Sequence, residues 1–174
     1  MERLGQTNPD KVIDLLCERL AAERSAVKLY DAILRKVKAS RHTQLKKFAR
    51  ELQEHRDQEE AHGEWCEEQI RALGGDPDEK TEKALLFETE SQGLEQVIFS
   101  DAPLSQMFHA LNMAELSDNA GWAQLIGLAE QAGDEDAKSE LEERLQHEED
   151  HLKLTHKIVG MFLRAEVMEG EEAQ

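Results

Sequence analysis

The sequence predicts an all-α protein built from four long helices, because three features favour helices over sheets. Only 5% of the residues are aromatic and only three are proline, a composition typical of long helices. Apolar residues recur at spacings of three, four or seven, as from Val12 to Val37, which is the period of an amphipathic helix. The length of 174 residues fits one compact domain, which we take as 1–174.

The first helix is expected over about 9–38. Asn8 can cap its first turn, Pro9 fits the first helical position, and Asp10 places a negative charge beside the helix N-terminus. The chain then breaks for a few residues near 40–43, so the second helix runs back antiparallel to the first.

The second helix is expected over about 44–73. It ends at 74–77, where the sequence Gly-Gly-Asp-Pro supplies a left-handed cap and then a residue that cannot continue a helix. The segment 76–101 is expected to be a crossover, with short helical patterns of its own around 82–87 and 94–99.

The third helix is expected over about 102–132, after the sequence Asp101-Ala102-Pro103, and the fourth over about 135–168, capped by Asp134. The crossover is long enough to return the chain along a helix of about 45 Å. Two antiparallel pairs joined by a long crossover are a known topology of four-helix bundles.

The charge balance excludes several function classes. The chain has 21 Lys+Arg against 38 Asp+Glu and a formal net charge of −17, which argues against binding to nucleic acid or to anionic lipid. No apolar run is long enough to span a membrane, and the first residues lack the apolar segment of a secretory signal. Two cysteines without a Cys-x-x-Cys pattern fit reduced thiols, so we expect a cytoplasmic protein.

Two Glu-x-x-His motifs suggest the chemistry. Glu59 and His62 fall in the middle of the second expected helix, and Glu148 and His151 in the middle of the fourth. A spacing of three residues puts both side chains of a pair on one helical face, where they can bind one metal ion. Either motif alone would also fit a solvent-facing acidic surface.

The other two helices offer one carboxylate each at the same depth. Glu23 interrupts the apolar stripe of the first helix, and Glu115 interrupts that of the third. A buried carboxylate costs several kcal/mol unless it is paired or coordinates a metal. Four glutamates and two histidines at one level therefore predict a site for two iron or manganese ions.

These residues resemble the ferritin-like superfamily of di-iron carboxylate proteins, and bacterioferritin and rubrerythrin in particular. The segment 62–77 is similar to the end of the second bacterioferritin helix, and the interval from Glu115 to Glu148 is similar to the spacing of its later ligands. Glu23 followed by Tyr30 also resembles its first helix.

The resemblance implies a ligand set and a function. It implies terminal ligands Glu23 and Glu115, bridging carboxylates Glu59 and Glu148, and one histidine for each metal, His62 and His151. It implies a ferritin-like four-helix bundle in which two iron ions react with O2 or peroxide, as in ferroxidases that handle iron. A rubrerythrin-like peroxide reductase, a manganese catalase, an oxygenase and a non-catalytic metal-binding module remain alternatives.

Departures from the family refine these expectations. Glu60 stands where bacterioferritin has its haem-ligating methionine, so no haem is expected. The Cys-x-x-Cys pair of the rubrerythrin electron-donor domain is missing, and the polar residues after Met168 do not resemble the fifth helix of cage-forming members. We therefore expect a homodimer rather than a cage of 24 subunits.

Four further residues have two interpretations each. Tyr30 either supplies an electron near the metals or only packs, and Asp118 is either an exchangeable carboxylate, as in rubrerythrin, or a hydrogen-bond acceptor near the ligands. Trp65 and Trp122 are interpreted as packing residues, with an electron path as the alternative.

Overall fold

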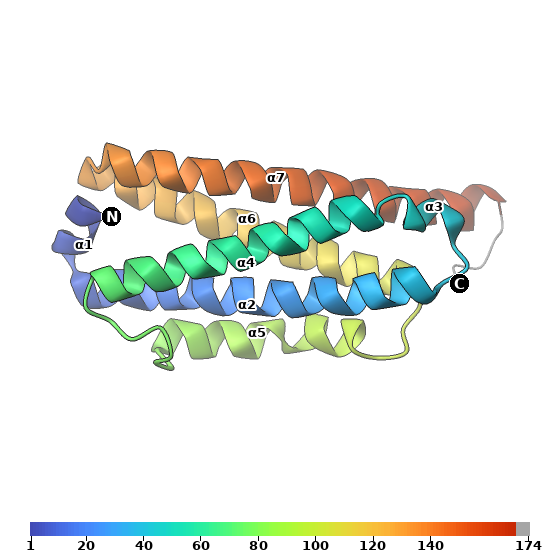
Figure 1. The fold of residues 1–174 in the computed structure, drawn as a ribbon, viewed down its shortest axis with the longest axis horizontal. Helices are drawn as coiled ribbons and strands as arrows, with labels where there is room; N and C mark the ends of the chain where they lie inside the picture. The colour runs from blue at the N-terminus through green and yellow to red at the C-terminus, as the bar shows by residue number, and fades with distance from the viewer. Residues whose placement is uncertain (170–174) are drawn as a thin grey trace.

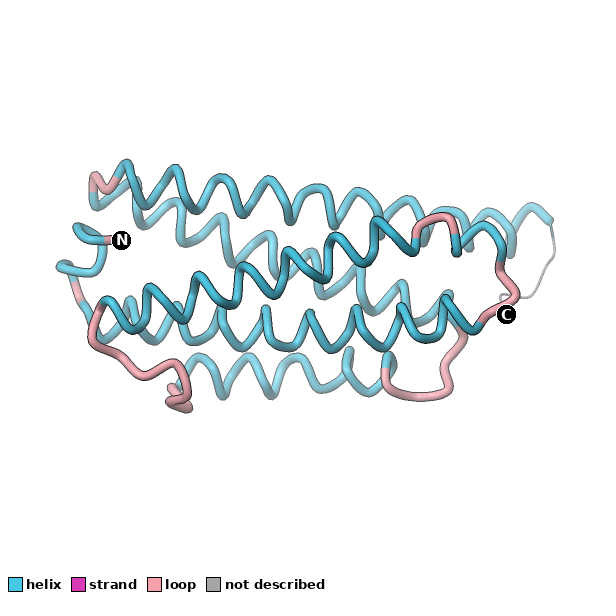
Figure 2. The backbone as a smooth tube through the Cα atoms, viewed as in Figure 1, coloured by secondary structure: helices cyan, strands magenta, loops and turns pink. Residues whose placement is uncertain are grey.

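The computed structural model describes residues 1–169, and the described chain is helical almost throughout, with no strand in that range (Figures 1 and 2). Its α-helices are α1 (Glu2–Thr7), α2 (Pro9–Ala39), α3 (Thr43–Lys46), α4 (Ala49–Ala72), α5 (Glu82–Ile98), α6 (Leu104–Ala132) and α7 (Glu135–Arg164), and a π-helical turn follows over Ala165–Glu169.

The four long helices α2, α4, α6 and α7 form the bundle. In Figure 1, α4 runs back along α2 and α7 runs back along α6, so the chain makes two antiparallel pairs, as the sequence predicts for a ferritin-like bundle. None of the helices within residues 1–169 combines the length and the apolar character needed to cross a membrane.

Local sequence signals explain most helix ends. The Asn8 side chain accepts a hydrogen bond from the backbone N–H of Lys11 at the start of α2. Gly133, with φ of 65°, ends α6 in the left-handed conformation, and the Asp134 side chain caps α7 by accepting from Ala137 N–H.

Three elements differ from the sequence-based expectation. The short helix α1 was not expected; its backbone is held because Asp134 Oδ2 accepts the N–H groups of Arg3 and Leu4 at 2.8 and 3.0 Å. The helix expected over 44–73 is divided into α3 and α4. Most of the expected crossover is one helix of 17 residues, α5, which packs on α2 and α6.

The bundle has two apolar clusters with a polar layer between them. One cluster surrounds Tyr30, Phe108 and Ile158, and the other surrounds Leu16 and Trp122. Along each long helix the chain passes from one cluster to the other through buried acidic side chains. Burial of one large apolar side chain stabilises a fold by about 1.5–3 kcal/mol, so the two clusters hold this polar layer in place.

Candidate metal centre

The polar layer contains a carboxylate–histidine cluster of six side chains from four helices. α2 contributes one residue, α4 two, α6 one and α7 two. None of the six is more than 3% exposed. They are Glu23, Glu59, His62, Glu115, Glu148 and His151. The structure thus brings together all six side chains that the sequence predicts as metal ligands.

The six side chains form two groups that share two carboxylates. Glu23 and His62 complete the first group, and Glu115 and His151 complete the second. Glu59 and Glu148 belong to both. In each group, one ligand atom from every residue lies within 4.8 Å of the others. Two sites with two carboxylates in common are the arrangement expected of bridging ligands.

Several of these atoms are buried without a hydrogen-bond partner. Both carboxylate oxygens of Glu23 and one oxygen each of Glu59, Glu115 and Glu148 have none. His62 Nδ1 lies 2.7 Å from Glu148 Oε1, yet the two atoms are not aligned for a hydrogen bond. A buried carboxylate without a partner costs several kcal/mol, so converging unpaired oxygens fit a site that binds cations.

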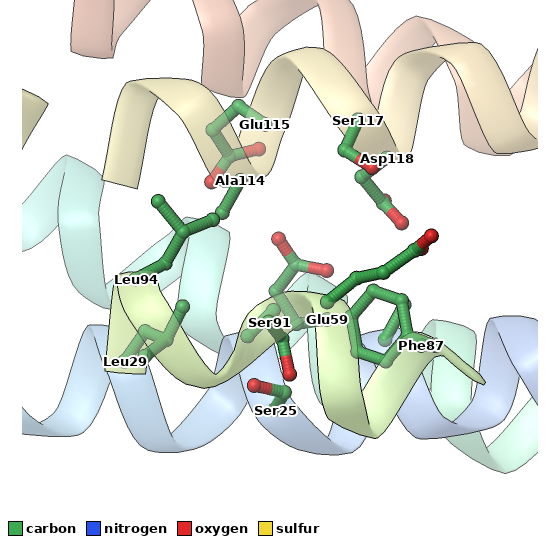
Figure 3. Close-up of a pocket in the computed structure, with 13 residues that line it drawn as sticks. Ser25, Leu29, Glu59, Phe87, Ser91, Leu94, Ala114, Glu115, Ser117 and Asp118 are labelled. Atoms are coloured by element: carbon green, nitrogen blue, oxygen red, sulfur yellow. The ribbon is translucent and has the colours of Figure 1, made fainter. Parts of the chain in front are cut away.

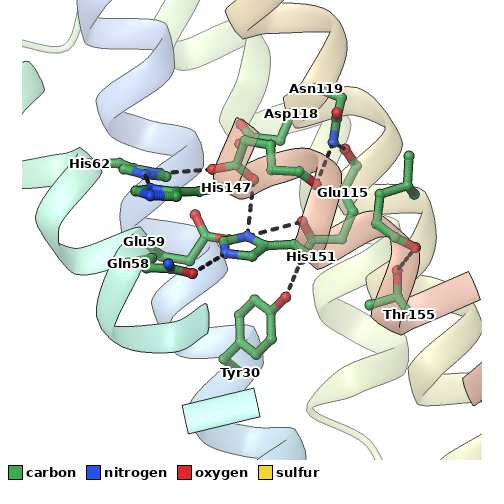
Figure 4. Close-up of polar contacts among 12 residues, drawn as sticks. Tyr30, Gln58, Glu59, His62, Glu115, Asp118, Asn119, His147, His151 and Thr155 are labelled. Carbon is green, nitrogen blue, oxygen red and sulfur yellow. Dashed lines mark hydrogen bonds and ion pairs between the residues drawn. The ribbon is translucent and has the colours of Figure 1, made fainter. Parts of the chain in front are cut away.

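Hydrogen bonds on the far side of each imidazole orient it toward the cluster (Figure 4). His151 Nε2 donates to Gln58 Oε1 at 2.9 Å, which leaves Nδ1 directed at Glu59 and Glu148, 3.0 and 3.1 Å away. His62 Nε2 lies 3.1 Å from Nδ1 of His147. Partners of this kind fix the tautomer and the ring orientation of metal-binding histidines.

Mutual repulsion and burial control the protonation of the cluster. Burial raises the pKa of Glu59 well above its usual range, and the nearby charges of Glu148 and Glu23 raise it further. Burial alone would lower the pKa of His62, but the carboxylates of Glu148 and Glu23 raise it to about 9. Without cations, protons therefore balance part of the negative charge.

Tyr30 lies directly beside the cluster. Its hydroxyl is buried and donates a hydrogen bond to Glu115 Oε1 at 2.7 Å. Burial and the negative charge of Glu115 hold the pKa of this phenol well above its usual value. The hydroxyl therefore remains protonated and keeps the Glu115 carboxylate in place.

Asp118 has different partners and lies outside both ligand groups. Its carboxylate forms a buried ion pair with Arg19 and accepts a hydrogen bond from Trp122 Nε1 at 3.2 Å. The guanidinium also lies against Gly121, where an added Cβ atom would clash with Arg19 Cζ. This arrangement places Asp118 as a hydrogen-bond acceptor between two buried donors.

The sequence does not predict several polar residues that lie next to the cluster. Arg19 and Gln58 have no spacing that marks them, because their partners Asp118 and His151 lie about a hundred residues away in the chain. Asn119 donates to the backbone oxygens of both Glu115 and Glu148 and so joins α6 to α7. A single polar residue on a helix gives no sequence signal for such a contact.

A cavity of about 90 Å³ connects with the cluster beneath α5 (Figure 3). Glu59 and Glu115 form part of its wall, and Phe87, Ser91 and Leu94 of α5 line the opposite side. A hydrogen bond links α2 to α5, because the Ser25 hydroxyl donates to Glu95 Oε1 at 2.7 Å. The cavity has room for a few water molecules or another small ligand.

Comparisons with known proteins agree with this architecture. The family model of the ferritin-like domain matches residues 13–164. A solved structure of ferritin-like, diiron-carboxylate proteins from Bacillus anthracis str. Ames superposes with a TM-score of 0.66 at 17% identity, covering 86% of this chain and 96% of that one. At this identity the likeness shows the fold. No curated protein matches the chain by sequence.

Proposed function

The chain belongs to the ferritin-like domain family, and from this premise we propose that it binds two iron ions and acts as a ferroxidase that uses O2 or peroxide. The observation that carries the proposal is the pair of buried ligand groups that share Glu59 and Glu148. The similar structure from Bacillus anthracis is described as a diiron-carboxylate protein, which supports the same assignment.

The chemistry of the ligand atoms fits iron, with manganese as the second choice. Each group offers three carboxylates and one imidazole, a mixture of hard and borderline donors that suits these metals. Four carboxylates balance the charge of two divalent ions, and the unpaired oxygens would gain partners on binding. When bound, two such ions supply two electrons to an oxidant at one place.

The surrounding residues have separate tasks in this proposal. Glu59 and Glu148 would bridge the ions, while Glu23 with His62 and Glu115 with His151 would complete the two ends. The Tyr30 hydroxyl holds Glu115 by a hydrogen bond, and a tyrosine in this position can also supply an electron.

The cavity beneath α5 gives a small oxidant a place next to the carboxylate–histidine cluster. Its wall contains Glu59 and Glu115, one bridging and one terminal carboxylate of the second group, and apolar side chains such as Leu29 and Leu94. A cavity of about 90 Å³ has room for O2 or peroxide beside these carboxylates. The two histidines approach the cluster from α4 and α7, so they leave the side that faces α5 open.

The contacts of Asp118 favour the ferroxidase over the rubrerythrin-like peroxide reductase. A carboxylate that exchanges with a histidine during turnover must be free to move, whereas this one is held by Arg19 and Trp122. The homodimer and the cytoplasmic location remain predictions from the sequence.

The proposal is tested by loading the protein anaerobically with Fe(II) and adding O2 or peroxide while ferric absorption is followed. Wild type should oxidise the bound iron, and Glu148→Ala should abolish this oxidation, whereas Glu143→Ala on the exposed face of α7 should not change it. Tyr30→Phe should leave metal binding intact and slow the reaction if the phenol donates an electron. A folded wild type that binds iron but does not oxidise it would be a non-catalytic module, and the proposal would be wrong.

A further inference from the structure

A row of aromatic rings leads from the carboxylate–histidine cluster toward the surface. The ring of Trp122 lies edge-on to the imidazole of His62, with 5.6 Å between centroids. Trp65 follows at 5.9 Å from Trp122. Trp122 is fully buried and Trp65 is 8% exposed, so the outer end of the row lies just beneath the surface.

Each indole in this row donates its N–H to a carboxylate. Trp122 Nε1 donates to Asp118 Oδ2 at 3.2 Å, and Trp65 Nε1 donates to Glu140 Oε2 at 3.0 Å. A buried indole N–H needs some acceptor, and a backbone oxygen would satisfy that need. Carboxylates are stronger acceptors that can also take the proton when the ring loses an electron.

The charges around the two rings differ. The Arg144 guanidinium lies 4.1 Å above the ring of Trp65, and a cation over the face opposes a second positive charge on the indole. Loss of an electron from Trp65 therefore favours simultaneous loss of its N–H proton to Glu140. Trp122 instead contacts His62, which belongs to a cluster containing four carboxylates.

We propose that Trp122 and Trp65 form a proton-coupled electron relay between the metal centre and the surface beside Glu140. This inference rests on the proposed function for the oxidant that draws the electrons inward. Trp122 gives one electron to the oxidised centre and its Nε1 proton to Asp118. Trp65 then gives one electron to the Trp122 radical, which regains its proton from Asp118, and the Trp65 proton passes to Glu140.

A soluble one-electron reductant completes this series of electron transfers. It returns one electron to the Trp65 radical at the surface, and the exposed carboxylate of Glu140 returns the proton, so that each transfer leaves both indoles unchanged. The relay gives the chain a route for electrons through Trp122 and Trp65, neither of which lines the cavity beneath α5.

Flash oxidation of the metal-free protein tests the relay independently of iron chemistry. A photogenerated ruthenium(III) polypyridyl complex in solution oxidises indoles that lie close to the surface, and transient absorption follows the tryptophanyl radicals. In wild type we expect a fast Trp65 radical and then a transfer phase in which it equilibrates with Trp122, which is the functional step run in reverse, because each indole has a carboxylate that takes its proton. Trp122→Phe should keep the first phase and lose the second, and Trp65→Phe should lower the radical yield at least tenfold.

A variant at the protein surface tests the relay even if a tryptophan variant does not fold. Glu140→Gln removes the proton acceptor from Trp65 without touching the core, and it should slow formation of the Trp65 radical at least tenfold and reduce its solvent isotope effect. Glu142→Gln, also exposed on α7, is the matched control and should behave as wild type. A wild-type trace without a transfer phase, or equal traces for the Gln variants, would overturn the relay.

The iron-loaded protein separates failure of the relay from failure of the proposed function. After addition of peroxide and rapid freezing, electron paramagnetic resonance should show a tryptophanyl radical in wild type and none in Trp122→Phe. Ferric iron without any indole radical would overturn the relay and leave the ferroxidase standing. If no ferric iron forms, the ferroxidase proposal is contradicted, and the flash experiment alone then decides the relay.

Discussion

The metal-free protein should lose stability as the pH rises from 6.5 to 9, and His62 should account for much of the loss. Its ordinary pKa is 6.5, and the carboxylates of Glu148 and Glu23 raise it to about 9 in the folded protein. A group whose pKa is higher when folded stabilises the fold below its ordinary value. That contribution disappears as the pH rises through the folded value.

The size of the effect follows from the same two values. One pKa unit corresponds to about 1.36 kcal/mol, so the change from 6.5 to about 9 is worth about 3 kcal/mol for this buried imidazole. Glu59 and Glu115, whose pKa values are also raised by burial, act in the same direction from lower pH. Bound metal should reverse the trend, because ligands must lose their protons to bind.

Urea unfolding in the presence of a chelator measures this dependence. Between pH 6.5 and pH 9 the wild type should lose at least about 3 kcal/mol of its free energy of unfolding, and His62→Gln should lose about 3 kcal/mol less than the wild type. His151 contributes to the loss in both proteins, because the neighbouring carboxylates raise its pKa against the effect of burial. His109→Gln, on the exposed side of α6, should retain the wild-type difference. Equal stability of the metal-free wild type at the two pH values, or the same slope in His62→Gln, would refute this description of the cluster.

Three further changes test the surroundings of the cluster. Asp118→Ala should destabilise the protein by about 3–5 kcal/mol, because it leaves Arg19 buried without a partner; the double variant Arg19→Met, Asp118→Leu should recover most of that loss in the same urea assay. Gly121→Ala should cost about 1–3 kcal/mol because its methyl group meets the Arg19 guanidinium. Gly127→Ala in the same helix, where nothing lies within 4 Å, should instead stabilise by about 0.5–1 kcal/mol, and similar melting temperatures for the two alanine variants would contradict the packing.

The sequence predicts the fold and the six cluster residues because both have local signals. Periodic apolar residues mark the long helices, and a carboxylate within an apolar stripe, as at Glu23, stands out against its neighbours. Two Glu-x-x-His motifs fix the register of α4 and α7. The family match and the structural likeness confirm the ferritin-like bundle, while the role of the six residues as ligands is still a prediction.

The remaining features depend on contacts between distant segments. The sequence predicts a crossover over 76–101 with short helical patterns around 82–87 and 94–99, whereas packing on α2 and α6 makes α5 one continuous helix. The pairing of Arg19 with Asp118 is equally hidden, because either residue alone looks like a surface charge. The sequence leaves two interpretations of Asp118 open, and only the structure shows which groups it contacts.

The most direct test of the central claim is the metal content of single-ligand variants after anaerobic loading with Fe(II) and removal of free iron. Wild type should bind two ions per chain. Glu23→Ala, which affects one ligand group, should keep about one, whereas Glu59→Ala, which affects both, should keep almost none. A folded wild type with one ion or none, or a Glu59→Ala variant that still binds two, would contradict a centre built on shared carboxylates.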